Sequence, residues 1–382
     1  MPRRDFTRRT KLAELAALFL RLGFTAFGGP AAHIAIMEDE VVRQRQWLSS
    51  ERFLDLLGAA TLIPGPSSTE LAIFIGYEQA GALGLVLGGV CFILPAALMV
   101  TVLAWAYVRF GALPQVAGLL YGIKPVVIAV VVQALLSLAP KAIKKSYWLG
   151  ALGVAACVAS ALDVDALVVL IGAGVICIAQ RRLRQPRGAA GFVLFGGLGG
   201  AGATVAAPVG MLALFLSFLK IGTVVFGSGY VLLAFLRADL VDRLHWLTEQ
   251  QLIDAVAIGQ VTPGPVFTTA TFIGYLLGGG WGALLATVGI FLPGFLLVAI
   301  SRPLVARVRR SQLASAFLDG VNVAALALMA VVTEQLARSA LVDVPTIFLT
   351  LVSTGTLMTC KVNTTWLIAS GALIGAVLKA IR

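Results

Sequence analysis

The stretch ATLIPGPSSTE, residues 60–70, places two prolines and a glycine inside a long apolar segment. Each proline removes a backbone N–H donor and clashes with the preceding helical turn, so a continuous helix is not expected to run through the stretch. Ser67, Ser68 and Thr69 follow directly, and hydroxyl side chains of this kind favour the start of a new helix. The stretch therefore predicts a half-helix that begins inside an apolar layer.

The composition indicates that this apolar layer is a lipid bilayer. Of the 382 residues, 59% are hydrophobic and 12% are charged, and the mean hydropathy is +0.96. Soluble domains carry about 25% charged residues, so the charges here are too few to cover a surface in water. Residues 81–107, 117–138 and 280–300 are apolar runs long enough to cross about 30 Å of hydrocarbon. The sequence predicts an all-α polytopic membrane protein.

The net charge of +11 does not indicate a nucleic-acid partner, because the basic residues gather at the ends of the apolar runs. That distribution follows the positive-inside rule of membrane proteins. The four cysteines lie far apart in apolar sequence and predict buried small side chains rather than a metal or redox site. We therefore expect a multi-pass protein in contact with the lipid bilayer, without a cofactor, metal or nucleic acid.

The break has a second copy at residues 263–265, where Pro-Gly-Pro recurs 199 positions after residues 64–66. Trp47 returns as Trp246 at the same spacing, and further matches follow at a spacing of 198. A constant spacing over this length indicates an internal duplication. The expected parts are a first transporter repeat at 1–180, a basic linker with a connecting transmembrane helix at 181–207, and a second repeat at 208–382.

The charges of equivalent loops predict that the two repeats are inverted relative to each other. The loop at Arg109 carries one basic residue, whereas its counterpart at 302–310 carries four arginines. The loop at 141–145 carries three lysines, whereas its counterpart at 338–343 has no net charge. By the positive-inside rule, equivalent loops then lie on opposite sides of the membrane.

Six apolar segments are expected in each repeat. They lie at 12–28, 53–79, 81–108, 116–139, 147–161 and 164–180, and at 208–228, 251–277, 280–301, 317–337, 346–360 and 363–380. With the connecting helix at 189–206, they predict 13 crossings, a cytoplasmic N-terminus and a C-terminus outside. Ten crossings is the alternative, if some short segments only dip into the membrane.

Each break predicts an anion site in the membrane interior. The first N–H groups of a helix have no partner within the helix and carry partial positive charge, so they bind anions. Transporters place substrates at such broken helices near the membrane midplane. The alternative is that both breaks are structural kinks. The residues expected to bind substrate at the breaks are Pro64, Gly65, Pro66, Ser67, Ser68, Thr69, Pro263, Gly264, Pro265, Thr268 and Thr269.

Two further sets of equivalent positions are candidates for the same anion. One set ends an apolar segment in each repeat and can form a nest of backbone N–H groups, or a plain helix end. The other is a polar position within apolar segments, which suits an anion site or a side chain that extends to the interface. The residues are Gly28, Gly29, Gly227 and Ser228 in the first set, and Lys124 and Asn322 in the second.

Three residues are candidates for a proton-linked or gating role. Glu70 lies in the first turn after the first break, where the helix dipole favours its carboxylate but a bound dianion repels it. His33 can titrate near neutral pH, and Glu38 follows in the same segment. The alternatives are a plain first-turn acid and an ordinary hydrogen-bonded histidine. Asp55 and Asp254, at equivalent segment starts, are expected to cap helices or to pair at the surface.

Taken together, the motifs resemble those of the chromate ion transporter family, in its long two-domain form. They are FGGPAAH at 27–33, the two Pro-Gly-Pro tripeptides, IGY at 75–77, and the Phe-to-Pro elements at 92–95 and 291–293. The resemblance implies a chromate efflux protein of a prokaryotic plasma membrane, which confers chromate resistance. The second repeat has no counterpart of His33 or Glu70, so we expect the two repeats to contribute unequally to the site.

The charge of chromate fits export driven by the membrane potential. Moving one charge outward is worth about 2.3 kcal/mol per 100 mV, so a dianion gains roughly 4.6 kcal/mol on leaving a cell that is negative inside. That sustains a roughly two-thousandfold outward accumulation. Alternating access of the repeats is the expected mechanism, without enzyme activity; a proton-coupled importer of sulfate or another oxyanion and an anion channel are the alternatives. Sulfate is an expected competitor, and a homodimer is left open.

Overall fold

The computed structural model describes residues 8–27, 29–111, 113–143, 146–162, 164–184, 210–225, 231–310, 312–360, 362 and 364–381. Within these ranges every regular element is helical. The first repeat contains α1 (Arg8–Thr25), α2 (Gly29–Glu38), η1 (Asp39–Gln44), α3 (Ser50–Ala60), α4 (Ser67–Phe110), α5 (Pro114–Ile143), α6 (Tyr147–Ala161) and α7 (Ala166–Arg184). The second repeat contains α8 (Met211–Val224), α9 (Leu232–Leu236), η2 (Arg237–Arg243), α10 (Glu249–Val261), η3 (Val266–Thr268), α11 (Thr269–Arg310), α12 (Gln312–Ala340), α13 (Val344–Thr359) and α14 (Thr364–Ile381).

The two repeats share the order of their elements and also their backbone irregularities. α4 is interrupted at Ala80 (φ −143°, ψ 20°) and Gly81 (φ 64°, ψ −145°). α11 is interrupted at Gly278 (φ −148°, ψ 21°) and Gly279 (φ 59°, ψ −150°), which are 198 positions further along the chain. The duplication in the sequence is therefore matched in the structure down to single backbone angles.

The interruption turns α4 into a helical hairpin with a short arm at 67–79 and a long arm at 82–110. The arms pack closely, since a side chain at Gly76 would overlap the carbonyl oxygen of Gly84. At 1.5 Å per residue, the short arm is about 20 Å long, which is less than the roughly 30 Å of a hydrocarbon core. α11 turns back at the equivalent glycines in the same way. Only the long arm of each hairpin has the length of a membrane crossing.

The segment at 53–79, expected to continue through the membrane after its break, instead folds back on itself. Arg52 at the start of α3 forms an ion pair with Glu78 near the end of the short arm (Nη2···Oε1 2.7 Å). The two ends therefore lie together and the Pro-Gly-Pro loop forms the tip. Gly65 in this loop has φ +128°, a left-handed conformation that glycine tolerates and that allows the chain to reverse.

α1 and α2 form a neighbouring hairpin. Glu40, which is buried in η1, forms ion pairs with Arg21 of α1 and with Arg45. The two helices therefore run antiparallel, and Ala26, just after α1, lies at the tip end of this hairpin. Gly29 starts α2 with φ +78°, so the chain also reverses here at a left-handed glycine.

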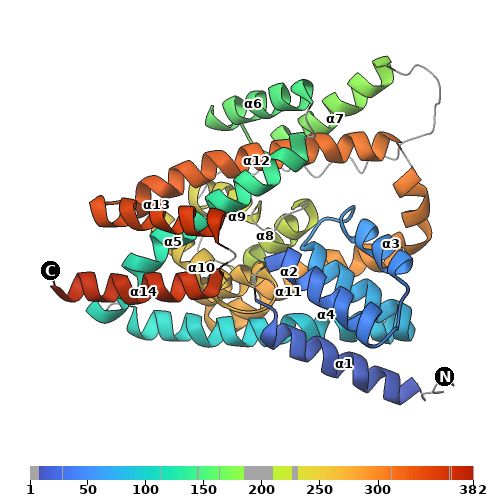
Figure 1. Cartoon of the computed structure of the whole chain (residues 1–382), viewed down its shortest axis with the longest axis horizontal. Coiled ribbons are helices and arrows are strands. Elements are labelled where there is room, and N and C mark those ends of the chain that lie inside the picture. Colours follow the sequence, from blue (N-terminus) through green and yellow to red (C-terminus); the bar gives the residue numbers. More distant parts are fainter. Residues whose placement is uncertain are drawn as a thin grey trace.

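The last helices of each repeat pack against the other repeat. α13 and α14 lie beside α5, and α6 and α7 lie beside α12 (Figure 1). A side chain at Gly122 of α5 would overlap the carbonyl oxygen of Gly371, and one at the equivalent Gly320 of α12 would overlap that of Ala173. Small residues at these crossings allow the helix backbones to approach closely. The two repeats are therefore interlocked rather than merely adjacent.

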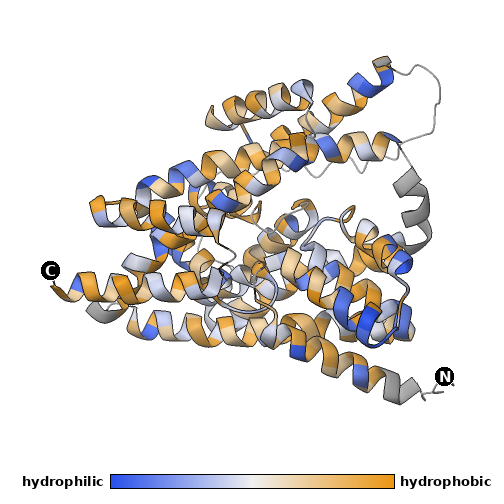
Figure 2. Ribbon diagram, viewed as in Figure 1, coloured by the Kyte–Doolittle hydropathy of each residue, from blue (hydrophilic) through white to orange (hydrophobic). Residues whose placement is uncertain are grey.

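The outer surface is apolar, as expected for a multi-pass membrane protein. Trp105 and Trp281 are more than half exposed, and Figure 2 shows hydrophobic residues along most helices, with hydrophilic residues mainly near helix ends. The connecting helix expected at 189–206 lies outside the described residues. In the described part of the chain, six helices are long and apolar enough to cross a membrane: Ser67–Phe110, Val116–Ile143, Ala166–Leu183, Val266–Ser301, Gln312–Ala340 and Thr364–Ile381.

Candidate functional site

Each Pro-Gly-Pro loop is bonded to the end of the first helix of the other repeat. Gly65 donates its backbone N–H to the carbonyl oxygen of Val225, just after α8 (2.7 Å). Gly264 donates in the same way to the carbonyl oxygen of Ala26, just after α1 (3.0 Å). Ala26 and Val225 are themselves 199 positions apart, so the two bonds are equivalent. This reciprocal pair brings both loops and the ends of α1 and α8 together.

The short arm of α4 begins at this meeting point, and its first turn is buried. Ser67 is 7% exposed, and Ser68 and Thr69 are each 1% exposed. Pro66 is the N-cap and provides no side-chain acceptor, while its carbonyl accepts the N–H of Thr69 (2.6 Å). The N–H groups of Ser67 and Ser68 precede the backbone bonds of the helix. The positive end of a helix dipole therefore points into the protein interior.

Two side chains in this first turn are buried and have atoms without a partner. Thr69 Oγ1 and Glu70 Oε2 both lack a hydrogen bond, and both residues are 1% exposed. A buried polar atom left in this state costs roughly 1–3 kcal/mol, and such atoms mark places where a ligand, ion or water belongs. Glu70 lies against the loop, because a side chain at Gly65 would overlap Glu70 Oε1, and a Cβ at Gly294 of α11 would be 3.0 Å from the same atom.

His33 of α2 forms hydrogen bonds with Ala26 at the end of α1 and with Ser68 at the start of α4. Its Nε2 lies 3.0 Å from the carbonyl oxygen of Ala26, and its Nδ1 lies 3.3 Å from Ser68 Oγ. Because a carbonyl oxygen can only accept, Nε2 carries the proton, and a neutral ring then accepts from the Ser68 hydroxyl at Nδ1. Phe92 packs edge-on against the ring (5.5 Å). His33 therefore orients the Ser68 hydroxyl rather than pointing at an open site itself.

The second break has a different first turn. Thr268 Oγ1 donates to the carbonyl of Pro265, and Thr269 Oγ1 donates to that of Val266, both at 2.8 Å. These hydroxyls are bonded to their own backbone, in the 3₁₀ turn η3 and at the start of α11. The first turns of the two breaks therefore differ in their hydroxyl bonding, and next to the second break Gln260 Nε2 is also buried without a partner.

The remaining candidates lie apart from this first turn or outside the described residues. Glu38 is half-buried at the end of α2, about 7 Å further along that helix than His33. Asn322 is exposed on α12. Gly29 starts α2 next to the meeting point. Gly28, Gly227 and Ser228 lie outside the described residues.

Lys124, expected to contact the anion or the interface, is held by two residues of α10. Its Nζ lies 3.1 Å from Asp254 Oδ1 and 2.6 Å from Gln250 Oε1. Tyr107 donates to Asp254 Oδ2 (2.9 Å). The expected surface position of Asp254 is wrong, since this residue is 3% exposed; its two partners lie far away in the sequence and cover it. The sequence did contain a sign of this burial, because an aspartate stands at the equivalent position of both apolar segments, as Asp55 and as Asp254.

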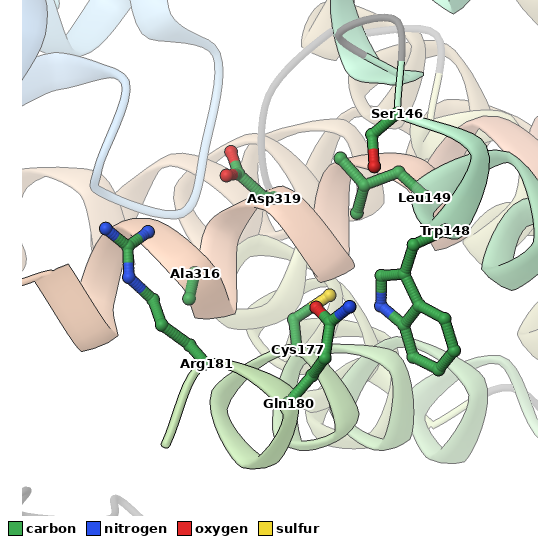
Figure 3. A pocket seen from close by; sticks show the side chains of 8 residues that line it. All are labelled: Ser146, Trp148, Leu149, Cys177, Gln180, Arg181, Ala316 and Asp319. Atoms are coloured by element: carbon green, nitrogen blue, oxygen red, sulfur yellow. The ribbon is translucent and has the colours of Figure 1, made fainter. Parts of the chain in front are cut away.

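A separate cavity of about 280 Å³ lies between the two repeats and contains none of the expected site residues. Figure 3 shows Cys177 and Gln180 of α7 beside Trp148 of α6, with Ala316 and Asp319 on α12. The broken helices do not contribute to its lining. We therefore take the meeting point of the loops, where unpartnered groups and a helix terminus coincide, as the candidate functional site.

An interlocked pair of helical repeats with long apolar helices defines a polytopic membrane protein, with a buried helix N-terminus between its repeats. Comparison with known proteins gives the family: the sequence model described as Chromate transporter matches residues 13–178 and 212–376. The chain belongs to this family, and the two matched stretches correspond to the two repeats. Membership supports a role in chromate transport.

Individual relatives agree with this assignment. The chain is 35% identical to a chromate transport protein of Cupriavidus metallidurans, over 96% of this chain and 93% of the relative. It is 33% identical to a probable chromate transport protein of Synechococcus elongatus (90% and 88%) and 32% identical to a chromate transport protein of Pseudomonas aeruginosa (87% and 83%). No solved structure matches the chain. The apolar helices and these bacterial relatives make it a multi-pass protein of a prokaryotic membrane.

Proposed function

We propose that this protein exports chromate by alternating access and holds the dianion at the N-terminus of α4. The observation that carries the proposal is the buried first turn at Ser67, Ser68 and Thr69, with Thr69 Oγ1 unpartnered. The free N–H groups and the hydroxyls supply the donors that a tetrahedral oxyanion requires, and the helix dipole favours its charge. The second break faces the first and closes the site from the other repeat.

The contacts of the long arm of α4 support an inverted arrangement of the repeats. This arm begins at residue 82, beside the open end of its own repeat's hairpin. Its middle residue Ala96 would be 2.7 Å from a Cβ at Gly264, the tip of the second repeat's hairpin. Further along, Tyr107 contacts Asp254, closer to the open end of that second hairpin. We therefore propose that the two hairpins enter the membrane from opposite sides and that their tips meet near its middle.

This arrangement gives alternating access a physical basis. Two equivalent backbone hydrogen bonds, at Gly65 and at Gly264, tie each loop to the other repeat. One repeat can therefore close the site toward one side of the membrane while the other repeat opens it toward the opposite side. A dianion is driven outward by a membrane potential that is negative inside, with the roughly 4.6 kcal/mol estimated for about 100 mV. In the orientation that we propose, the N-terminus lies in the cytoplasm and the C-terminus lies outside.

Radiolabelled chromate uptake into inside-out vesicles tests the proposal. The vesicles contain the purified protein, an interior-positive potential is imposed, and unlabelled sulfate serves as competitor. We expect saturable uptake that follows the potential, with a loss of about tenfold or more when Ser67, Ser68 and Thr69 are replaced by alanine. The matched control replaces Thr268 and Thr269, whose hydroxyls are already bonded to the backbone.

Other outcomes separate the alternatives. Flux that does not saturate identifies a channel, and uptake that follows an imposed proton gradient but not the potential identifies the proton-coupled importer. Equal losses in the two variants would place the site elsewhere than the first break. Absence of chromate uptake by folded protein would remove the substrate assignment.

A further inference from the structure

Glu70 is buried at the proposed anion site and has no cationic partner among the described residues. It occupies the first turn of the 13-residue short arm of α4, and its side chain packs on the backbone of Gly65 and of Gly294. Glu70 Oε2 has no hydrogen-bond partner. In the described part of the chain, no salt bridge joins this carboxyl group to a lysine or arginine. Its charge is therefore balanced only by the helix terminus that the proposed site assigns to the oxyanion.

A carboxylate and a dianion compete for this helix terminus. Two like charges held a few ångströms apart inside a protein cannot both remain ionised without a compensating cation. A weakly basic dianion such as sulfate takes up a proton far less readily than a carboxylate that is cut off from water. Binding of the oxyanion therefore favours the protonated form of Glu70, and the ionised form of Glu70 opposes binding.

The groups on the surrounding elements do not take over this role. His33 on α2 reaches the first turn through Ser68, but its Nε2 proton is held by the Ala26 carbonyl. The Pro-Gly-Pro loop contacts Glu70 through Gly65, and α11 contacts it through Gly294, so these contacts bring no charged side chain to Glu70. Three cations near the α4 hairpin are already paired: Arg52 of α3 with Glu78, Arg21 of α1 with Glu40, and Lys124 of α5 with Asp254 of α10.

We propose that the oxyanion binds together with one proton, which resides on the Glu70 carboxyl group. The step is an association: an ionised Glu70, one proton from solution and one dianion give a neutral Glu70 beside the bound dianion, and release on the far side reverses it. One net negative charge then crosses the membrane in each cycle instead of two. The inference rests on the proposed oxyanion site and specifies its coupling.

The first test measures proton uptake on binding. Potassium chromate is added to the purified wild-type protein in weakly buffered detergent solution, and the protons consumed per anion bound are measured with a pH indicator. The Glu70→Gln variant is the matched control, because it keeps the shape of the side chain and cannot ionise. Protonation of chromate itself contributes equally to both proteins, so the difference belongs to Glu70.

The second test measures affinity against pH by equilibrium dialysis of labelled chromate. We expect the wild-type affinity to fall by about tenfold per pH unit on the alkaline side of the Glu70 titration, as linkage to one proton requires. The Glu70→Gln variant is expected to bind with an affinity that lacks this dependence. A repeat on the wild type with sulfate, which stays a dianion over the range, needs no variant and covers the case in which Glu70→Gln does not fold.

The outcomes are distinct. About one extra proton taken up per anion by the wild type, and none by the variant, supports the inference. Chromate or sulfate binding by the wild type without proton uptake overturns it and leaves the oxyanion site in place. Failure of the folded wild-type protein to bind either anion removes the site and the inference together.

Discussion

Gly65 donates its backbone N–H to the carbonyl oxygen of Val225 at 2.7 Å and thereby joins the first break to the second repeat. The equivalent bond runs from Gly264 to Ala26 at 3.0 Å. Neither bond involves a side chain, so the contact depends on the path of the backbone through each loop. The conformation of two glycines therefore determines whether the repeats meet correctly.

Replacing Gly65 with alanine tests this dependence. Its φ of +128° disfavours any residue with a Cβ, by roughly 1–2 kcal/mol, and the new methyl group would overlap the Glu70 carboxyl group. We expect a lower thermal unfolding temperature in detergent and a loss of chromate transport. Gly172→Ala is the control, because a Cβ there meets nothing within 4 Å. Equal unfolding temperatures for the two variants would contradict the assigned strain.

Replacing Gly122 with alanine tests the interlocking of the repeats. The added methyl group would push α5 away from the backbone of α14 at Gly371, and such overpacking costs about 1–3 kcal/mol. We expect destabilisation in a thermal unfolding assay. The control is Gly355→Ala on α13, where the new methyl group has open space. A Gly122 variant as stable as this control would show that α5 and α14 do not pack as described.

The ion pair between Lys124 and Asp254 predicts that removing one partner is worse than removing both. Their side chains are 16% and 4% exposed, and an uncompensated buried charge costs about 3–5 kcal/mol. Asp254→Leu should therefore destabilise strongly, and adding Lys124→Met should recover much of the loss. The measurement is a double-mutant cycle on unfolding free energy. The exposed pair of Arg338 and Glu334 is the control, with an expected effect within about 1 kcal/mol.

Additive effects in that cycle would contradict the pairing of Lys124 with Asp254. In that case the two residues would act independently, and Lys124 would again be available for an anion. Transport assays on the double variant add a separate readout, since a purely structural pair can be replaced without loss of chromate affinity.

Glu249 at the start of α10 predicts a pH dependence of stability. A hydrogen bond from Ser339 and one from Arg237 hold the pKa of the Glu249 carboxyl group below its usual value of 4.5. A lowered carboxyl pKa adds stability at pH values above 4.5, and this stability is lost as the pH falls through the lowered pKa. Ser339→Ala should therefore destabilise the protein at neutral pH and have little effect in strong acid. Thermal unfolding across that pH range measures it, and an equal loss at every pH would point to packing instead.

The features predicted from the sequence are those with local causes. Two prolines that flank Gly65 disfavour a continuous helix, and three hydroxyl residues favour a new start, so the half-helix of α4 followed from residues 60–70. The duplication followed from a constant spacing between matching motifs. The unequal contribution of the repeats to the site stays a prediction, which rests on the absence of a second Glu70.

The features that sequence reasoning missed depend on contacts between distant residues. The break near residue 80 was predicted by the boundary between the segments 53–79 and 81–108, but the return of residues 67–79 alongside α3 was not, because it depends on the pairing of Arg52 with Glu78. Asp254 is buried because Tyr107, 147 positions away in the chain, covers it. No window of local sequence contains such pairs.

The interlocking of α6 and α7 with α12 has a consequence for biogenesis. α7 ends at Arg184, whereas its partner α12 begins at Gln312, so 127 residues of chain separate their syntheses. At about 5–20 residues per second, the ribosome takes roughly ten seconds to produce that stretch. During this interval the newly made α6 and α7 lack their native neighbour and must be shielded by lipid or by the insertion machinery. The first half of the protein is therefore an assembly intermediate until the second half is inserted.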